Sequence, residues 1–90
     1  MSIKIDVPAP MQPLTDNLTT VEVNGGTVGE CLSNLVKQFP NIAEMLFTTD
    51  GRLLGYIGVY VNQELTQSDE LAKPVRDGDE IYLPYITTGG

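Results

Sequence analysis

Hydrophobic and polar residues alternate in four stretches of the chain, and each alternation predicts a strand with one buried face. The stretches are residues 3–7, 19–23, 57–62 and 80–83. Pro8 and Pro10 follow the first stretch and Asn24-Gly25-Gly26 follows the second. Residues 8–18 are therefore expected to be a loop, and the first two strands to pair as a long-looped hairpin.

The third and fourth stretches predict which side chains face outward. In 57–62, Ile57, Val59 and Val61 fall on one face and Gly58, Tyr60 and Asn62 on the other. In the last stretch, Ile81 and Leu83 alternate with Glu80 and Tyr82, and Pro84 ends the strand by removing a backbone donor. Tyr60 and Tyr82 are thus expected on the open face, either as a cross-strand pair or as part of a docking site. Leu65 is expected to add a brief edge pairing.

The segment 27–39 has the spacing of a helix. Thr27-Val28-Gly29-Glu30 matches a capping box, in which Glu30 reaches back to the N–H of Thr27. One apolar stripe follows, formed by Val28, Leu32, Leu35, Val36 and Phe39, and Pro40 ends it. Cys31 lies at the edge of this stripe, which favours a buried structural thiol over a sulfur relay. Residues 41–46 predict a further short turn of helix.

The order strand, strand, helix, strand, strand predicts a mixed sheet of four to five strands with one main helix on one face. This is an α+β fold of the β-grasp, ubiquitin-like type. Residues 1–84 are expected to form a single domain, and residues 85–90 a flexible C-terminal tail.

Charge and amino-acid composition exclude several kinds of partner and of chemical site. The 90 residues carry a formal charge of −7, with 5 basic and 12 acidic side chains, which argues against nucleic acid and anionic membranes and favours a basic protein partner. With one cysteine and no histidine, the chain has no ligand set for a His/Cys metal site and no Ser/His or Cys/His pair. No apolar run of membrane-spanning length and no signal peptide is evident, so a cytoplasmic location is expected.

The final stretch begins with an acidic turn, Asp77-Gly78-Asp79-Glu80, and ends in Gly89-Gly90. The acidic turn is interpreted as a solvated surface turn in preference to a cation site. A terminal Gly-Gly is by itself typical of a frayed end. Chemistry at the terminal carboxylate offers a second interpretation, because residues without a Cβ let a partner enzyme close around the acyl carbon.

Taken together, these features resemble the ubiquitin-like sulfur carriers, the family of ThiS and the small molybdopterin synthase subunit MoaD. The specific part is the pattern D-G-D-x-hydrophobic-x-L-P, a short tail and G-G, which residues 77–90 match. The early hairpin, the helix start and residues 60–64 extend the resemblance over nearly the whole chain. The connection containing residues 51–54 is most similar to the branch that supplies sulfur for cysteine synthesis. Family members commonly have three residues between Leu-Pro and Gly-Gly, whereas this chain has four, residues 85–88.

The resemblance implies that this protein is itself the substrate of other enzymes and is not an enzyme. An E1-like adenylating enzyme would use ATP to activate the Gly90 carboxylate, and sulfur transfer would convert it to a thiocarboxylate. The carrier would bind no cofactor itself. A sulfur-accepting synthase, such as a pyridoxal-phosphate-dependent cysteine synthase, would then take the sulfur for cysteine, molybdopterin or thiamine. The tail residues would be Thr87, Thr88 and Gly89, and the docking residues Tyr60, Tyr82, Tyr85 and Ile86.

Two alternatives remain open from the residues alone. A ubiquitin-like modifier would join Gly90 to a lysine of a target protein after the same activation step. A plain β-grasp interaction module would make no chemical use of its Gly-Gly end.

Overall fold

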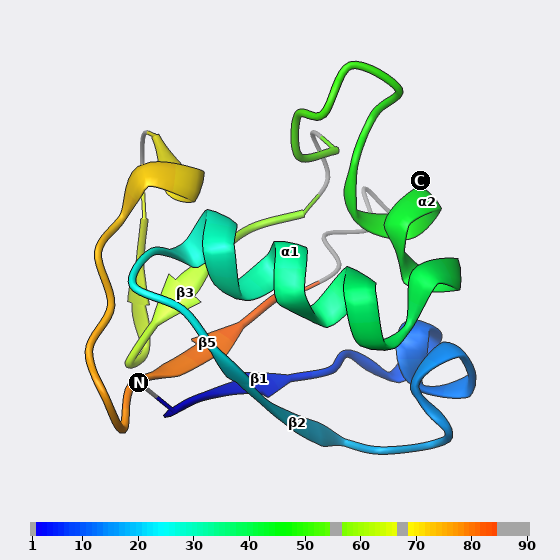
Figure 1. Cartoon of the computed structure of the whole chain (residues 1–90), viewed down its shortest axis with the longest axis horizontal. Coiled ribbons are helices and arrows are strands. Elements are labelled where there is room, and N and C mark those ends of the chain that lie inside the picture. Colours follow the sequence, from blue (N-terminus) through cyan, green and yellow to red (C-terminus); the bar gives the residue numbers. More distant parts are fainter. Residues whose placement is uncertain (1, 55–56, 67–68, 85–90) are drawn as a thin grey trace, which may run out of the picture.

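The computed structural model describes residues 2–54, 57–66 and 69–84, which form one mixed sheet with the helix α1 (Val28–Gln38) across one face (Figure 1). The strands are β1 (Ser2–Asp6), β2 (Thr20–Asn24), β3 (Tyr60–Val61), β4 (Glu64–Leu65) and β5 (Glu80–Tyr82). Their order is β2-β1-β5-β3-β4, with β1 and β5 parallel and the other neighbours antiparallel. The predicted β-grasp fold is confirmed, with the five strands at the upper end of the expected range.

The two N-terminal strands pair as the predicted hairpin, but the prediction of a loop over residues 8–18 was wrong. A 3₁₀ helix, η1, spans Ala9–Thr15 and buries Met11 and Thr15. It starts where the amide of Met11 donates to the carbonyl of Pro8 at 2.9 Å. Prolines suggested a break in structure, yet the φ that proline fixes suits the first turn of a helix.

The helix α1 begins at the predicted cap. The Thr27 hydroxyl accepts from the Glu30 amide at 3.1 Å. The Glu30 carboxylate accepts from the amide of Gly26 at 2.7 Å, one residue before the expected amide of Thr27. Two backbone bonds hold the segment before β5 against this start of the helix, from Val28 N to Lys73 O at 2.9 Å and from Val75 N to Gly26 O at 3.0 Å.

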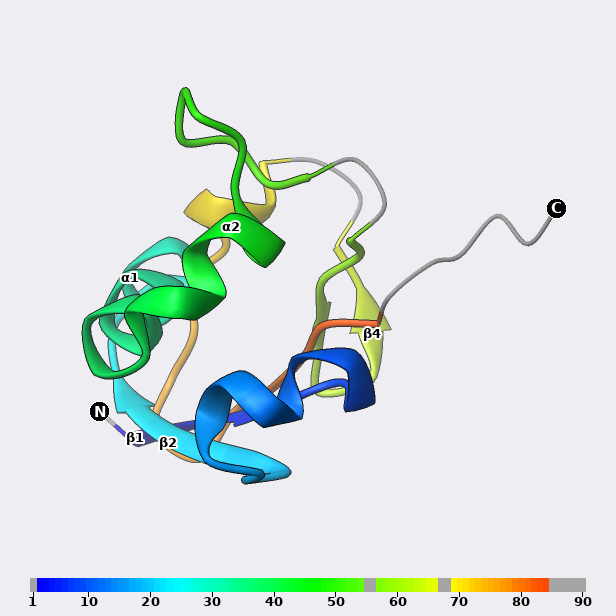
Figure 2. The same ribbon diagram turned by 90° about the vertical axis from the view of Figure 1, so that its right-hand side faces the viewer.

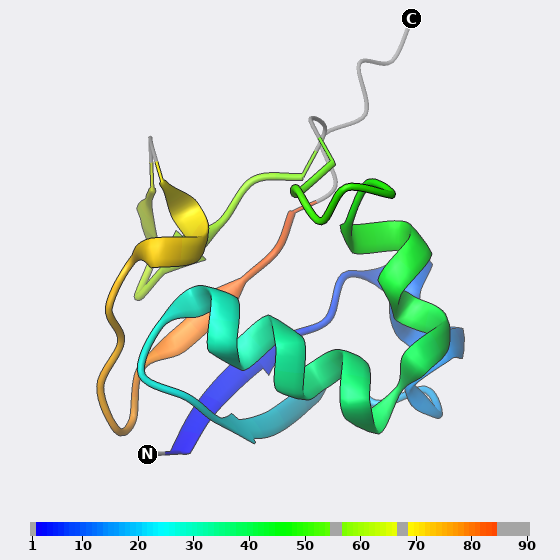
Figure 3. The same cartoon turned by 45° about the horizontal axis from the view of Figure 1, so that its top comes forward.

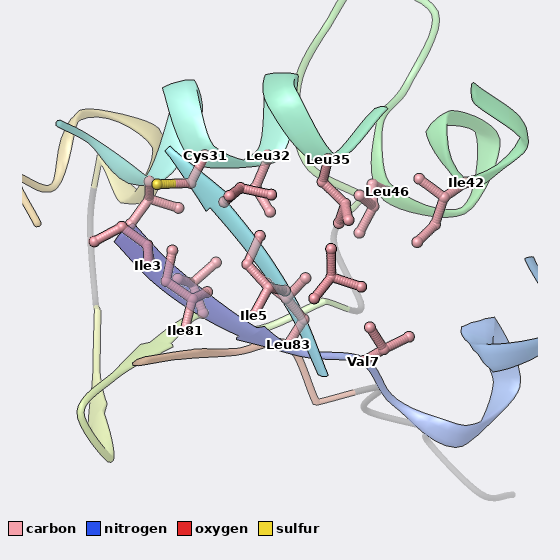
Figure 4. Packing of buried hydrophobic residues seen from close by; sticks show 14 of the residues in the cluster. Ile3, Ile5, Val7, Cys31, Leu32, Leu35, Ile42, Leu46, Ile81 and Leu83 are labelled. Carbon is pink, nitrogen blue, oxygen red and sulfur yellow. The ribbon is translucent and has the colours of Figure 1, made fainter. Parts of the chain in front are cut away.

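The core lies between α1 and the sheet (Figure 4). Of the predicted helix stripe, Val28, Leu32 and Leu35 are fully buried, while Val36 and Phe39 are partly buried against the core. The strands contribute Ile3, Ile5, Val21, Val23, Val61 and Ile81, and the residues next to β3 and β5 contribute Val59 and Leu83. Burying each such aliphatic side chain contributes about 1.5–3 kcal/mol to folding.

Cys31 belongs to this core, as expected for a structural thiol. Its side chain is fully buried, and burial, followed by the nearby Glu30 carboxylate, raises the pKa of the thiol. A Cβ on Gly25 would come within 2.7 Å of the Cys31 sulfur, so the packing around the thiol leaves no space there. A protonated, enclosed thiol is poorly suited to relay sulfur.

A second short helical segment closes the far end of the core. A 3₁₀ turn over Pro40–Ile42 leads into α2 (Ala43–Leu46), which confirms the predicted turn of helix. Ile42 and Leu46 are fully buried. Figure 3 shows α2 continuing from the end of α1, and Figure 2 shows both helices on the side of the molecule opposite β4.

The third strand is shorter than predicted. Its inward residues Ile57, Val59 and Val61 are buried as expected, but the ladder covers only Tyr60–Val61. Gly58, expected on the open face, is buried, and its amide donates to the carbonyl of Pro84 at 3.3 Å. Asn62 and Gln63 adopt the left-handed conformation, with φ of 50° and 72°, and turn the chain into β4.

The acidic turn before β5 joins that strand to the turn after β3. Asp79 accepts from the side-chain amide of Asn62 at 2.9 Å and from the backbone amide of Arg76 at 2.8 Å. Asn62 in turn accepts from the amide of Glu80 at 2.9 Å. We call these three bonds the Asn62–Asp79 clasp. The two bonds that Asp79 accepts, first that from Asn62 and then that from Arg76, lower the pKa of its carboxyl. No group of three or more metal-ligating side chains occurs among the described residues, and the acidic turn instead holds two chain segments together.

We expect Asp79→Ala to destabilise the protein by about 1 kcal/mol at pH 7, because the clasp loses its acceptor. A lowered pKa in the folded state means that ionised Asp79 stabilises the fold above its unfolded pKa. That contribution is lost as the pH falls through the lower, folded value. Urea unfolding at pH 7 and pH 3 should therefore show a difference from wild type that shrinks in acid. Glu44→Ala, which removes an exposed carboxylate from α2, is the control. A difference that does not shrink would contradict the role of the ionised carboxylate.

Candidate docking site

Tyr60 and Tyr82 meet on the open face of the sheet, which is the face opposite α1. They are direct partners in the β3–β5 ladder, and their ring centroids lie 6.1 Å apart at an interplanar angle of 48°. Tyr82 is 45% exposed, and Tyr60 is half-buried. The cross-strand pair expected from the alternation is therefore present, and its two rings still present apolar surface to solvent.

Leu65 extends this aromatic pair to the edge of the sheet. It stands opposite Tyr60 in the β3–β4 ladder and is 50% exposed. Side chains of directly opposed residues share a face of the sheet. From the sequence Leu65 was expected only as an edge pairing, and its place beside the tyrosines follows from a register that the sequence does not specify. We call Tyr60, Tyr82 and Leu65 the open-face apolar row.

Acidic side chains flank the row. Asp6 pairs with Tyr82 across the parallel β1–β5 ladder, and a shallow hollow of about 300 Å³ is lined by Asp6, Tyr60, Gln63, Glu80 and Tyr82. Beyond it, Lys4 stands between Glu22 and Glu80 in register. Apolar rings within a mostly negative surrounding fit a partner with an apolar centre and basic rim.

The remaining predicted site residues lie outside the described residues: Tyr85, Ile86, Thr87, Thr88, Gly89 and Gly90. Their point of attachment is described. β5 lies between β1 and β3, Leu83 is buried, and the carbonyl of Pro84 accepts from Gly58. The terminal segment thus follows directly from the central strand that carries Tyr82.

The described residues contain no helix long and apolar enough to cross a membrane. Within the same residues, Cys31 is buried in the core and stands apart from the open face. The site thus combines an apolar surface flanked by acidic side chains with a C-terminal segment that continues from Pro84, two residues after Tyr82.

Comparison with known proteins finds similar proteins that align with all or nearly all of this chain. The sulfur carrier protein CysO of Mycobacterium tuberculosis is 29% identical over 93 aligned residues, with all of both chains covered. A chain of the Amycolatopsis orientalis BexX/CysO complex superposes with a TM-score of 0.88 at 28% identity, covering 98% of this chain and 99% of that one. Small archaeal modifier protein 1 of Haloferax volcanii, SAMP1, gives 0.86 at 29% identity, with both chains fully covered.

The family comparison covers both the fold and the chain end. The model of the ThiS family matches residues 5–90, which include the end of β1, all of β2 to β5, α1 and the terminal Gly-Gly. This match extends through the D-G-D turn and Leu-Pro pair on which the sequence resemblance was based. The chain therefore belongs to the ThiS family.

Proposed function

We propose that this protein is a sulfur carrier whose C-terminal Gly90 is converted to a thiocarboxylate and donates its sulfur in biosynthesis. The observation that carries the proposal is the family match through Gly90, on a chain whose last strand also presents Tyr82. A reactive group at the chain end would then be attached next to the surface that docks on its partners.

The chemistry requires a separate activating enzyme. A carboxylate is a poor electrophile, so ATP supplies a leaving group: the Gly90 carboxylate forms an acyl adenylate and pyrophosphate is released. A sulfur donor then displaces AMP and leaves the thiocarboxylate. The E1-like adenylating enzyme would hold the ATP, and the carrier would contribute its chain end and its docking surface.

For the acceptor we infer a cysteine-synthase-like enzyme that depends on pyridoxal phosphate. The relatives named CysO support this branch over thiamine or molybdopterin synthesis. The open face supports a transient complex, because polar residues surround only a small apolar row. The exposed polar side chains on this face include Lys4, Thr20, Glu22 and Glu80, with Asp6 half-buried.

A second function, conjugation of Gly90 to lysines of target proteins, has one specific observation in its favour. The likeness to small archaeal modifier protein 1 of H. volcanii is of the same order as the likeness to CysO. Activation would be identical, and only the acceptor would differ. Mass spectrometry of protein from its native cell distinguishes the two, since a carrier gives a free thiocarboxylate and a modifier gives an isopeptide-linked lysine.

Deletion of Gly90 tests the reactive end. We expect normal folding, because residue 90 follows the last strand by several positions, and complete loss of adenylation. Pyrophosphate exchange with the cognate activating enzyme measures adenylation, and circular dichroism checks the fold. Undiminished exchange would refute the carrier function.

Tyr82→Ala tests the docking face. We expect binding to the activating enzyme to weaken by about thirtyfold or more, as for a central aromatic anchor at an interface. Ile86→Glu is expected to act in the same direction. Leu18→Ala is the matched control, because Leu18 is also 45% exposed but lies outside the open-face apolar row. Calorimetric titration gives affinity and thermal melting gives stability. If Tyr82→Ala lowered the melting temperature and left affinity unchanged, the residue would be structural.

The acceptor is tested with the thiocarboxylated protein. Incubation with a cysteine-synthase-like enzyme and O-phosphoserine or O-acetylserine should add a cysteine at Gly90. The sulfur forms a bond to the serine β-carbon as phosphate or acetate leaves, and intact mass reports the adduct. The carboxylate form, which has no sulfur to donate, is the control. Absence of the adduct with both donors, together with transfer to a pterin precursor or a thiazole synthase, would reassign the pathway.

A further inference from the structure

The strand β2 leaves one edge of the sheet unpaired over five residues, whereas the opposite edge strand, β4, has only two. Figures 1 and 3 show β2 as the outermost strand, with α1 running above it. Proteins commonly protect exposed edges with proline, lysine or a bulge. Thr20-Val21-Glu22-Val23-Asn24 contains no proline or lysine and pairs with β1 in unbroken register.

The hydrogen-bond pattern shows which groups of β2 point outward. The amide of Val7 donates to the carbonyl of Thr19 at 2.9 Å, so this pair is a hydrogen-bonded one. Antiparallel ladders alternate, which places Val21 and Val23 in the next hydrogen-bonded pairs. The backbone groups of Thr20 and Glu22 therefore point away from β1. Among the described residues, no backbone partner is found for them.

A polar groove runs along this edge. It has a volume of about 430 Å³, and one wall is formed by the C-terminal half of α1, with Asn34, Lys37 and Gln38. Glu22 and Asn24 from β2 line the other side. The side-chain amide of Asn34 donates to the carbonyl of Asn24 at 2.6 Å, which shows that this edge can be reached by a donor from the helix side.

We propose that the β2 edge binds an extended segment of a partner protein by strand addition, with a Lys or Arg of that segment opposite Glu22. In antiparallel pairing, the outward N–H and C=O of Glu22 would both bond the residue that faces it, and side chains of such a pair share a face. Glu22 is exposed on the open face, so its opposite residue should be basic. The neighbouring residues of the segment would point into the groove beside Asn34 and Lys37, which suits polar or acidic side chains.

A second copy of this chain is the less favourable occupant. Two β2 strands paired antiparallel about Glu22 would place two Glu22 carboxylates directly opposite each other. Like charges in that position are destabilising, and each chain also carries a net charge of −7. The repulsion between the two carboxylates and the negative net charge of the chain both favour a strand from a different protein that carries positive charge.

The test uses the full-length protein and a phage-displayed library of random decapeptides. We expect selected peptides to share a Lys or Arg flanked by polar residues, and to shift the amide signals of Thr20, Glu22 and Asn24 in ¹⁵N-correlated spectra. Glu22→Pro removes the outward N–H, which β1 does not use, and should abolish binding. Glu22→Lys keeps that N–H in case the proline variant does not fold, and should weaken binding about fivefold through charge reversal.

Glu44→Lys, which makes the same change in charge on the exposed side of α2, should bind the peptides as wild type does. The inference is overturned if the library yields no binder, or if binders shift the signals of Tyr60 and Tyr82 in place of the β2 edge. Equal binding by Glu22→Lys and wild type would also overturn it. The inference is also overturned if sedimentation velocity shows that the wild-type protein is a dimer and that Glu22→Pro or Glu22→Lys disrupts it. A second copy of the chain would then be the occupant of the edge.

Discussion

The position of β5 between β1 and β3 is the constraint on which the rest of the molecule depends. Ile81 stands in register with Ile5 on one side and with Val61 on the other, and all three are buried in the core. Because β1 and β5 are parallel, the chain between them has to return to the end of the sheet where β1 begins. The connection that makes this return contains α1. The last strand is consequently held on both sides, and the C-terminal residues that follow it are attached to the middle of the sheet.

The same register fixes what the open face presents. Side chains alternate along a strand, so burying Ile81 and Leu83 forces Tyr82 outward. A slip of one residue would bury Tyr82 and expose Ile81, so the packing of the core and the candidate docking surface would be lost together. Packing of the core therefore positions the tyrosine pair, and a separate structural device for presenting the rings is unnecessary.

The sequence contained the signals for this arrangement wherever a local pattern determined it. Alternation predicted the strands, the Thr27 capping box located the start of α1, and the spacing of its apolar residues predicted the buried face. The sequence did not contain pairings that depend on register, so the place of Leu65 beside Tyr60 could not be derived. Two local signals were misleading. The prolines after β1 suggested a loop where η1 forms, and the alternation over 57–62 suggested a longer strand than the two residues of β3.

The hollow on the open face and the groove beside β2 differ in physical character, and no residue lines both. The hollow on the open face is lined by residues of β1, β3 and β5 and the β3–β4 turn, including two aromatic rings, whereas the β2 groove is polar and offers backbone hydrogen bonds. An enzyme that acts on the chain end must reach the side where β5 ends, near Tyr82. A strand added to β2 would leave that region uncovered, since β1 separates β2 from β5. Occupation of the edge is therefore compatible with the proposed chemistry at Gly90, and under both proposals a partner bound there would hold the carrier while its terminus passes from one enzyme to the next.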